Sequence, residues 1–428
     1  MKNEYDVVIF GGGPAGIACA YNARRFGLKT LLAEKNNYLG GQITGALVVP
    51  MMKSASDNIN TEFFDALVKY SKDYGAQAVY MDGNNGWFNP VILKIVFEKM
   101  LKDAGVDILF SAEISDAEIS SDTEGKSVKS VKILSKNSET LSIHIYSKYF
   151  VDATGDSKFC EILNCNFIDD FGKFQPASLR FIVSGIDLEK FSSQILDLDK
   201  DRDVTSACKI NGQIHLSTAY TFDTNRNWGL SPLFKKALRN GDLKHSDTAY
   251  FQVFTIPGMP DSLAFNCPRL QNYDKTNVFA YSNSLIEARE VIFRLYNFVK
   301  KYFNGCKNSY ISQIADMTGF RVSKRPKTKY IYKLQDIMSS KAFDNPVLAA
   351  DYPVDIHSND ENSSTLHCVK KYYLPIESLM SADYKNLFTA GRNVGAEFEA
   401  QAALRIQKSC LSMGEGVAKF IKNAICAD

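Results

Sequence analysis

The segment YDVVIFGGGPAG, residues 5–16, decides the fold of the N-terminal part of this chain. Its first half, Tyr5–Phe10, is a nearly continuous apolar run, which is typical of a strand buried on both faces of a parallel sheet. Residues 15–26 follow with a helical pattern that ends at Gly27. The pattern Gly11-x-Gly13-x-x-Gly16 therefore lies between a strand and a helix, which is the context of a dinucleotide-binding turn.

The glycines have different physical roles in such a turn. Gly11 permits the tight turn, Gly13 lets a pyrophosphate approach the amides at the positive helix end, and Gly16 allows close helix–strand packing. Glu34 follows the next strand, where a carboxylate accepts hydrogen bonds from ribose hydroxyls. The alternative is a glycine-rich turn without a ligand. The complete unit favours a dinucleotide site.

Three later features favour FAD over NAD. Gly40 and Gly41 follow the ribose position, as expected for backbone beside a long cofactor, although an ordinary turn has the same pattern. Residues 151–156 (VDATGD) read as a buried strand that breaks at a small turn. Residues 387–393 (LFTAGRN) precede a helix whose first amides would face the anionic edge of a reduced flavin. We therefore expect FAD as the cofactor.

Local patterns predict the other elements. Residues 90–110 predict a helix and a strand, and residues 112–150 predict a three-stranded antiparallel meander, with a separate buried strand at Tyr149–Ala153. A long helix at 284–303 is predicted to begin with the capping box Ser284-x-x-Glu287. One long helix is expected after Asn393.

This order predicts an α/β fold: a Rossmann-like FAD-binding domain with a β-meander, plus an inserted α+β substrate domain. Residues 1–173 form the first part of the FAD-binding domain, residues 174–385 form the substrate domain, and residues 386–428 return to the first domain.

Composition and charge argue against several classes of function. The 428 residues carry a formal net charge of +2, so no general attraction to nucleic acid is expected. No apolar run approaches the roughly 20 residues that cross a bilayer, and the first residues lack a secretory pattern. The nine cysteines are scattered without a CxxC pair, which argues against a disulfide framework and a metal site. We expect a cytoplasmic protein.

Further segments resemble a known family. They are Phe88-Asn89-Pro90, the run from Gly319 to Arg325 (GFRVSKR), and Asp355-Ile356-His357. Together with the cofactor motifs they resemble the FAD-dependent oxidoreductase family, within the glutathione-reductase-type FAD superfamily. The order of the motifs is kept over nearly the whole chain. Lys324, Pro326 and Thr328 depart from the family pattern, so the resemblance does not carry over a substrate.

The motifs and the resemblance together imply a set of cofactor-binding residues. The set is Gly11, Gly13, Pro14, Ala15, Gly16, Glu34, Lys35, Gly40, Gly41, Gln42, Ile114, Ala153, Thr154, Gly155, Gly391 and Arg392. By the same resemblance, Ile114 is expected to contact adenine through its backbone.

The candidates for substrate chemistry lie in the inserted domain. Arg321 and Arg325 are candidates to clamp a carboxylate or phosphate, because a guanidinium binds such groups in a bidentate manner. The alternative is a solvated basic run from Lys324 to Lys329. His357 is a candidate general base oriented by Asp355, and the alternative is a structural histidine.

The leading hypothesis is an FAD-dependent enzyme that dehydrogenates a small polar or anionic substrate by hydride transfer to flavin N5. The alternatives are a flavin monooxygenase, a flavin reductase that uses NAD(P)H, and a non-catalytic dinucleotide-binding protein or NAD-dependent enzyme. The sequence leaves the electron acceptor and the oligomeric state open.

Overall fold

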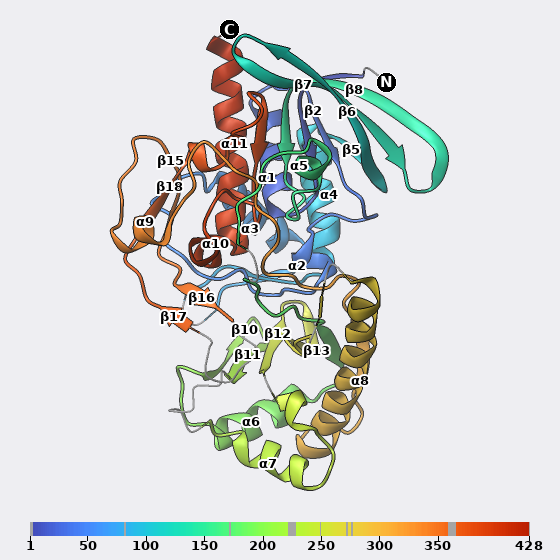
Figure 1. Ribbon diagram of the computed structural model, residues 1–428. Helices are drawn as coiled ribbons and strands as arrows, with labels where there is room; N and C mark the ends of the chain where they lie inside the picture. The colour runs from blue at the N-terminus through green and yellow to red at the C-terminus, as the bar shows by residue number, and fades with distance from the viewer. Residues whose placement is uncertain are drawn as a thin grey trace.

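The computed structural model describes residues 3–427 except 81–82, 171–172, 221–227, 249, 271–272, 275–276 and 358–364. Figure 1 shows two parts stacked along the long axis of the molecule. The upper part contains a seven-stranded sheet. Both the first strand and the last helix of the chain lie in this upper part. The lower part contains a six-stranded sheet flanked by helices. This is the predicted mixed α/β architecture with a Rossmann-like core.

The upper sheet places the motif-bearing strand ends at one edge. Its strands are β1 (Glu4–Phe10), β2 (Thr30–Ala33), β5 (Asp107–Leu109), β6 (Ala112–Asp122), β7 (Gly125–Ser135), β8 (Ser138–Asp152) and β19 (Leu387–Thr389). Parallel pairing joins β5, β2, β1, β8 and β19, with Val7 opposite Thr30 and Leu387 opposite Phe150. In a parallel sheet the carboxyl ends share one edge, where ligands bind. The turns after β1, β2, β8 and β19 therefore meet.

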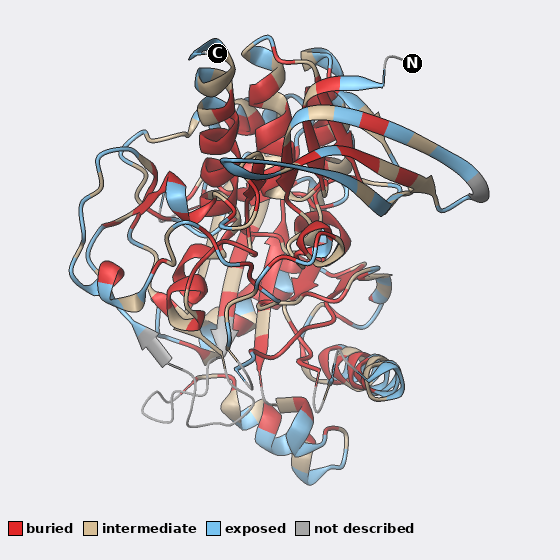
Figure 2. Cartoon of the chain, turned by 45° about the horizontal axis from the view of Figure 1, so that its top comes forward, coloured by how far each residue is buried: buried red, intermediate tan, exposed pale blue. Residues whose placement is uncertain are grey.

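The prediction of two separate strands before residue 153 was wrong. β8 is one continuous strand that changes partners near Tyr146, which is opposite Ser130 of β7 and Glu4 of β1. Its first half belongs to the antiparallel meander and its second half to the parallel sheet. Local composition cannot show this, because the partner changes while the backbone conformation does not. The meander of β6, β7 and β8 projects from the sheet, and most positions of β6 are exposed (Figure 2).

Helices cover the parallel sheet. They are α1 (Pro14–Arg25), α3 (Glu62–Asp73), α4 (Ile92–Ala104), α5 (Lys158–Ile162), α10 (Phe398–Leu404) and α11 (Gln407–Ala427). α1 and α11 lie side by side (Figure 1), and a Cβ on Gly414 would stand 2.0 Å from the carbonyl oxygen of Ala15. Only glycine permits this approach. The C-terminal helix was predicted as one, but Arg405 and Ile406 separate α10 from α11.

The lower sheet has the order β10-β11-β12-β13-β9-β14 and is antiparallel. Its elements are β9 (Phe181–Ser184), α6 (Leu188–Leu198), β10 (Thr205–Ile210), β11 (Gln213–Tyr220), α7 (Ser231–Arg239), η1 (His245–Thr248), β12 (Phe251–Ile256), β13 (Met259–Phe265), α8 (Val278–Tyr302) and β14 (Tyr310–Ile314). A separate hydrophobic core lies beneath this sheet.

The capping box predicted at Ser284 was wrong. α8 begins at Val278, and Asn277 caps it by accepting hydrogen bonds from the backbone amides of Phe279 and Ala280. The Ser284 hydroxyl instead donates to the carbonyl oxygen of Tyr281 inside the helix. The sequence holds two capping signals, and the earlier asparagine is used.

Smaller elements connect the two parts. They are α2 (Gln42–Gly45), β3 (Gln77–Ala78), β4 (Trp87–Phe88), α9 (Leu334–Met338), β15 (Pro346–Ala350), β16 (Val354–Ile356), β17 (Thr365–His367), β18 (Tyr372–Pro375) and η2 (Ile376–Ser378). Tyr332, Leu374 and Leu379 are buried in the same core as α1 and α11. Much of the stretch after residue 330 thus packs with the FAD-binding domain, and the predicted boundary at 385 stays a proposal. Within the described residues, no helix combines the length and apolarity needed to span a bilayer.

Candidate active site

The glycine turn after β1 forms a cradle with one open position. Gly11 has φ +101°, and a Cβ there would lie 2.5 Å from the carbonyl oxygen of Ala153. A Cβ on Gly16 would lie 1.9 Å from the carbonyl oxygen of Gly11. At Gly13, by contrast, a Cβ would meet no atom within 4 Å, and its φ of −78° suits any residue. Gly11 and Gly16 are therefore required by packing, whereas the space over Gly13 is available to a ligand.

Glu34 lies at the end of β2 beside this cradle. Its carboxylate is buried and accepts hydrogen bonds from the backbone amides of Gly12 at 2.6 Å and Asn36 at 2.9 Å. The two amides hold the carboxylate on the wall of a cavity that Gly13 and Lys35 also line. This is the position that the sequence predicts for the ribose-binding carboxylate.

Asp152 joins the two distant strand ends. Its carboxylate is fully buried and accepts hydrogen bonds from the Thr154 hydroxyl at 2.7 Å, the Cys160 amide at 3.0 Å and the Asn393 amide group at 3.3 Å. Burial raises the pKa of Asp152, although these donors act in the opposite direction. The two motif turns are also joined by Arg392, which forms an ion pair with Asp156 at 3.1 Å.

One cavity of about 1640 Å³ extends from the cradle into the space above the lower sheet. Ligand pockets of roughly 300–1,000 Å³ are typical for one small molecule, so this space accommodates a dinucleotide together with a substrate. Most of the predicted cofactor set lines it: Gly11, Gly13, Pro14, Ala15, Glu34, Lys35, Gly41, Gln42, Ala153, Thr154, Gly155, Gly391 and Arg392.

Three predicted cofactor residues lie outside the cavity wall. Gly16 packs against Gly11, and Gly40 has φ +103° at the turn beside Thr44. Ile114 lies on β6 opposite Ile133, with its side chain against the core beneath the meander. Its backbone contact with adenine stays a prediction.

Arg325 was predicted to bind substrate, but the structure gives it a different environment. Its side chain is buried away from the cavity wall. The guanidinium forms an ion pair with Asp170 and donates to the carbonyl oxygens of Ala396 at 2.8 Å and Ser323 at 3.0 Å. These contacts connect three segments of the chain. Arg325 therefore stabilises the structure around the site, and its assignment as a catalytic residue is corrected.

Arg321 lines the cavity, and its role as a substrate ligand stays a prediction. The segment before it is tied to the FAD-binding domain, because the carbonyl oxygen of Phe320 accepts hydrogen bonds from Gln42 at 2.7 Å and Arg392 at 3.1 Å. The Arg321 guanidinium donates to the carbonyl oxygen of Pro176 and to the Ser178 hydroxyl. Burial lowers its pKa well below the usual range. Arg321, the candidate to bind the substrate, thus directly follows a residue that is hydrogen-bonded to the predicted cofactor residues Gln42 and Arg392.

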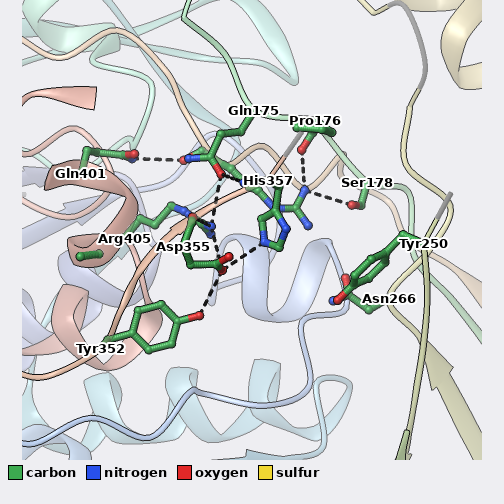
Figure 3. Close-up of polar contacts among 12 residues, drawn as sticks. Gln175, Pro176, Ser178, Tyr250, Asn266, Tyr352, Asp355, His357, Gln401 and Arg405 are labelled. Atoms are coloured by element: carbon green, nitrogen blue, oxygen red, sulfur yellow. Dashed lines mark hydrogen bonds and ion pairs between the residues drawn. The ribbon is translucent and has the colours of Figure 1, made fainter. Parts of the chain in front are cut away.

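His357 also lines the cavity, and both of its ring nitrogens have partners. Nε2 lies 3.1 Å from the Asp355 carboxylate (Figure 3), and Nδ1 lies 3.0 Å from Nη2 of Arg269. Because a guanidinium only donates, Nδ1 is the acceptor and the proton is on Nε2. Burial and the charge of Arg321 lower the pKa of His357 to about 3, against the effect of Asp355. The ring is therefore neutral near pH 7.

Asp355 lies between His357 and Arg405 and contacts both side chains. Burial alone would raise its pKa, but the His357 hydrogen bond and the charges of Arg405 and Arg321 lower the pKa below its ordinary value. Arg405 is 3.4 Å from the carboxylate, and the Tyr352 hydroxyl donates to it at 3.2 Å. Asp355 thus stays ionised and fixes the tautomer of His357, as the predicted orienting role requires.

Sequence reasoning missed several further arginines on the cavity wall, among them Arg180, Arg269 and Arg405. Each has apolar neighbours in the sequence, as in LRFIV around Arg180 and ALRI around Arg405. A charged residue inside an apolar run is rarely buried without a partner. An arginine among apolar neighbours was therefore the sequence feature that could have marked these positions as functional. This feature does not show that the three residues line the same cavity.

The low pKa of His357 predicts acid sensitivity. An unfolded histidine has a pKa of about 6.5, so the folded state binds fewer protons than the unfolded state as the pH falls below that value. At pH 5 this linkage should cost the wild-type protein about 2 kcal/mol relative to pH 7. The His357→Gln variant should lose this part of the pH dependence, measured as unfolding midpoints at saturating cofactor. The exposed His245→Gln variant should keep it, and equal slopes for all three proteins would contradict the prediction.

Comparison with known proteins agrees with the geometry. A family model described as FAD dependent oxidoreductase matches residues 6–427. Digeranylgeranylglycerophospholipid reductase of Methanococcus vannielii is 39% identical over 69 residues, which cover 16% of this chain and 18% of that protein. Thiamine thiazole synthase of Metallosphaera sedula is 28% identical over 158 residues, which cover 35% of this chain and 54% of that protein. The matched regions thus span less than two thirds of either relative.

A solved structure is similar over the whole chain. The flavin-dependent monooxygenase PieE, crystallised in complex with FAD and substrate, has a TM-score of 0.51 at 12% identity. The match covers 100% of this chain and 59% of that chain. At this identity the likeness establishes a shared fold.

Proposed function

The chain belongs to the family of FAD-dependent oxidoreductases, and from this premise we propose that it dehydrogenates a small polar or anionic substrate by hydride transfer to flavin N5. We also propose that its FAD-binding domain is of the glutathione-reductase type, which the order of its motifs supports. All nine cysteines are free thiols, namely Cys19, Cys160, Cys165, Cys208, Cys267, Cys306, Cys368, Cys410 and Cys426. This supports a cytoplasmic location, because the cytoplasm keeps thiols reduced.

The cradle fits FAD. The open position over Gly13 lies at the N-terminus of α1, where backbone amides and the helix dipole would hold a pyrophosphate. Glu34 would accept hydrogen bonds from the ribose. When bound, FAD supplies an acceptor for two electrons. The remaining chemistry, which is binding and orienting the substrate and taking its proton, falls to side chains of the cavity.

One observation carries the proposal. Arg321 and His357 line the same cavity as Gly13 and Glu34, and Phe320 is hydrogen-bonded directly to Gln42. A substrate held by Arg321 therefore lies in the same cavity as the cofactor. A buried guanidinium binds an anionic group strongly because little water competes with it.

We assign His357 the role of the general base that accepts a proton from the substrate. Asp355 holds Nε2, so Nδ1 is the atom that accepts a proton, provided that Arg269 releases it. Next to burial, the charge of Arg321 is the strongest influence lowering the pKa of His357. An anionic group on Arg321 would neutralise that charge and raise the pKa. Substrate binding would thereby make His357 a better base.

Anaerobic spectroscopy of the FAD-loaded protein tests this function. We expect one or more small anionic metabolites to bleach the flavin absorbance in the absence of NADH and NADPH. Bleaching only by NADH or NADPH would instead support the reductase or monooxygenase alternatives. If the protein fails to retain added FAD, or if no compound reduces it, the dehydrogenase proposal is wrong.

A further inference from the structure

The long helix α8 has two apolar faces. One faces the core of the lower part, where Ile292 and Leu295 are buried. The other faces solvent on the outer flank of the lower part (Figure 1), where Phe279, Ile286 and Phe293 are 83%, 58% and 59% exposed. A single exposed apolar side chain is ordinary, but a row of them marks an interaction surface. We call Phe279, Ile286 and Phe293 the α8 seam.

The spacing of the α8 seam is that of a helix–helix contact. Its members are seven residues apart, or nearly two helical turns, so they form one narrow row along about 21 Å of the helix. Glu290 and Asn297 lie four residues after Ile286 and Phe293 and are also exposed. These polar side chains make the face unsuitable for lipid, because their burial in an apolar medium is costly. A second helix can instead offer them polar partners.

A surface hollow on α8 has the form of a helix-binding position. Its volume is about 520 Å³, and it is lined by Ile286, Arg289, Glu290, Phe293 and Arg294. The first four have the spacing i, i+3, i+4 and i+7, so they are neighbours on the helix surface. Four residues arranged in this way form the hole that receives a side chain of a facing helix in a coiled coil. The structure therefore presents a preformed contact surface for a helix.

The charges at the centre of this hollow are self-complementary. Arg289 and Glu290 are exposed and adjacent in the sequence. Arg294 is paired with the buried Asp247 at 2.8 Å and lies 3.9 Å from Glu290, which exceeds hydrogen-bond distance. A two-fold axis between residues 289 and 290 would bring Arg289 of each copy opposite Glu290 of the other. The same axis would bring Ile286 opposite Phe293 on both sides.

We propose that the α8 seam pairs with the α8 seam of a second copy of this chain in an antiparallel arrangement. A contact that uses the same patch on both copies closes as a dimer. Burial of the apolar side chains supplies the affinity, because an exposed ion pair contributes only about 0–1 kcal/mol. The ion pairs fix the direction, since a parallel pair in register would place like charges opposite each other.

The proposed interface reaches the wall of the large cavity. Tyr281, Leu285 and Arg289 line that cavity from α8. Glu290 of the second copy would therefore hold the guanidinium of a residue on the cavity wall. Dimer formation does not depend on the proposed dehydrogenase activity, so either proposal can fail while the other stands.

Sedimentation velocity of the FAD-loaded full chain tests the dimer. We expect the wild-type protein to dimerise with a dissociation constant of about 10 µM, because polar residues interrupt the apolar row. Ile286→Asp and Phe293→Asp should each weaken the dimer about 100-fold, since each places a charge in the contact. Leu141→Asp makes the same change at a side chain of the meander that is 64% exposed, and it should leave the dimer intact. A wild-type protein that is monomeric at about 100 µM, or a dimer that neither seam variant weakens, would overturn the inference.

A charge exchange tests the antiparallel direction. Arg289→Glu gives a chain with two acidic residues at the centre of the seam, and Glu290→Arg gives a chain with two basic ones. Each variant alone should self-associate about tenfold more weakly than the wild type, because like charges meet. An equimolar mixture should form a heterodimer with the wild-type affinity, since both ion pairs are restored. A mixture that associates no better than the separate variants would contradict the proposed contact.

Vesicles distinguish a second copy from a lipid surface. The wild-type protein should not sediment with vesicles of phosphatidylcholine and phosphatidylglycerol. A monomeric wild-type protein that binds these vesicles, and loses this binding in Phe293→Asp, would overturn the inference in favour of a lipid surface. Retained FAD and an unchanged unfolding midpoint identify the variants that are folded. If a variant is not folded, the mass of the wild-type protein and the mixture of the charge variants decide the question.

Discussion

Replacing Gly13 with alanine is expected to weaken FAD binding about 100-fold, or roughly 2.7 kcal/mol, while the apoprotein stays folded. The added methyl group meets no atom within 4 Å, and φ is −78° there, so the substitution introduces neither a clash nor backbone strain. It does occupy the space through which a pyrophosphate would approach the amides of α1. Fluorescence titration of the apoprotein with FAD measures the loss.

Two glycine controls make this test specific. Gly16→Ala places a methyl group 1.9 Å from the carbonyl oxygen of Gly11 and should prevent correct folding. Gly212→Ala, in the turn between β10 and β11, lies in open space with φ +81° and should cost about 1 kcal/mol of stability without affecting FAD. A Gly13→Ala protein that purifies with a full complement of FAD would show that the cofactor does not approach this position.

Arg321→Ala is expected to retain FAD and to slow substrate-dependent flavin reduction by a factor of about 100 to 1,000, which corresponds to roughly 3–4 kcal/mol. The side chain lines the cavity, and its hydrogen bonds go to the carbonyl oxygen of Pro176 and the hydroxyl of Ser178 rather than to residues of the cradle. Its removal therefore takes away a substrate ligand and leaves the cofactor contacts. Arg321→Lys should recover only part of the rate, because lysine lacks the bidentate fork. Stopped-flow reduction under anaerobic conditions measures both variants.

Arg325→Ala is the matched control for that experiment. Its removal leaves Asp170 without its ion-pair partner, so we expect a loss of about 3–5 kcal/mol of stability. The reduction rate per bound FAD should change little, because Arg325 does not line the cavity. If the Arg325 variant lost the rate and the Arg321 variant kept it, the assignment of the two residues would be reversed.

Much of the cofactor site could be predicted because its signals are local. A buried strand, a glycine turn and a helix are adjacent in residues 5–26, and the same succession of buried strand and small turn marks Asp152 and Thr389. Parallel pairing then brings their ends together at one edge. The errors arose where two local solutions compete. The start of α8 at Val278 rather than Ser284 is such a case, because both positions offer a cap.

The sequence by itself determined that this chain carries a dinucleotide cradle, since the strand, the glycine turn and the helix that form it are adjacent in residues 5–26. Only the tertiary structure decided that Arg325 is structural, that His357 is neutral and that Arg180, Arg269, Arg321 and Arg405 line one cavity. Charge, burial and pKa depend on which segments pack together, and residues 180, 269, 321 and 405 lie far apart in the chain. The arrangement of the substrate-binding residues therefore depends on the tertiary fold, whereas the glycine turn of the cofactor site can be recognised from residues that are adjacent in the sequence.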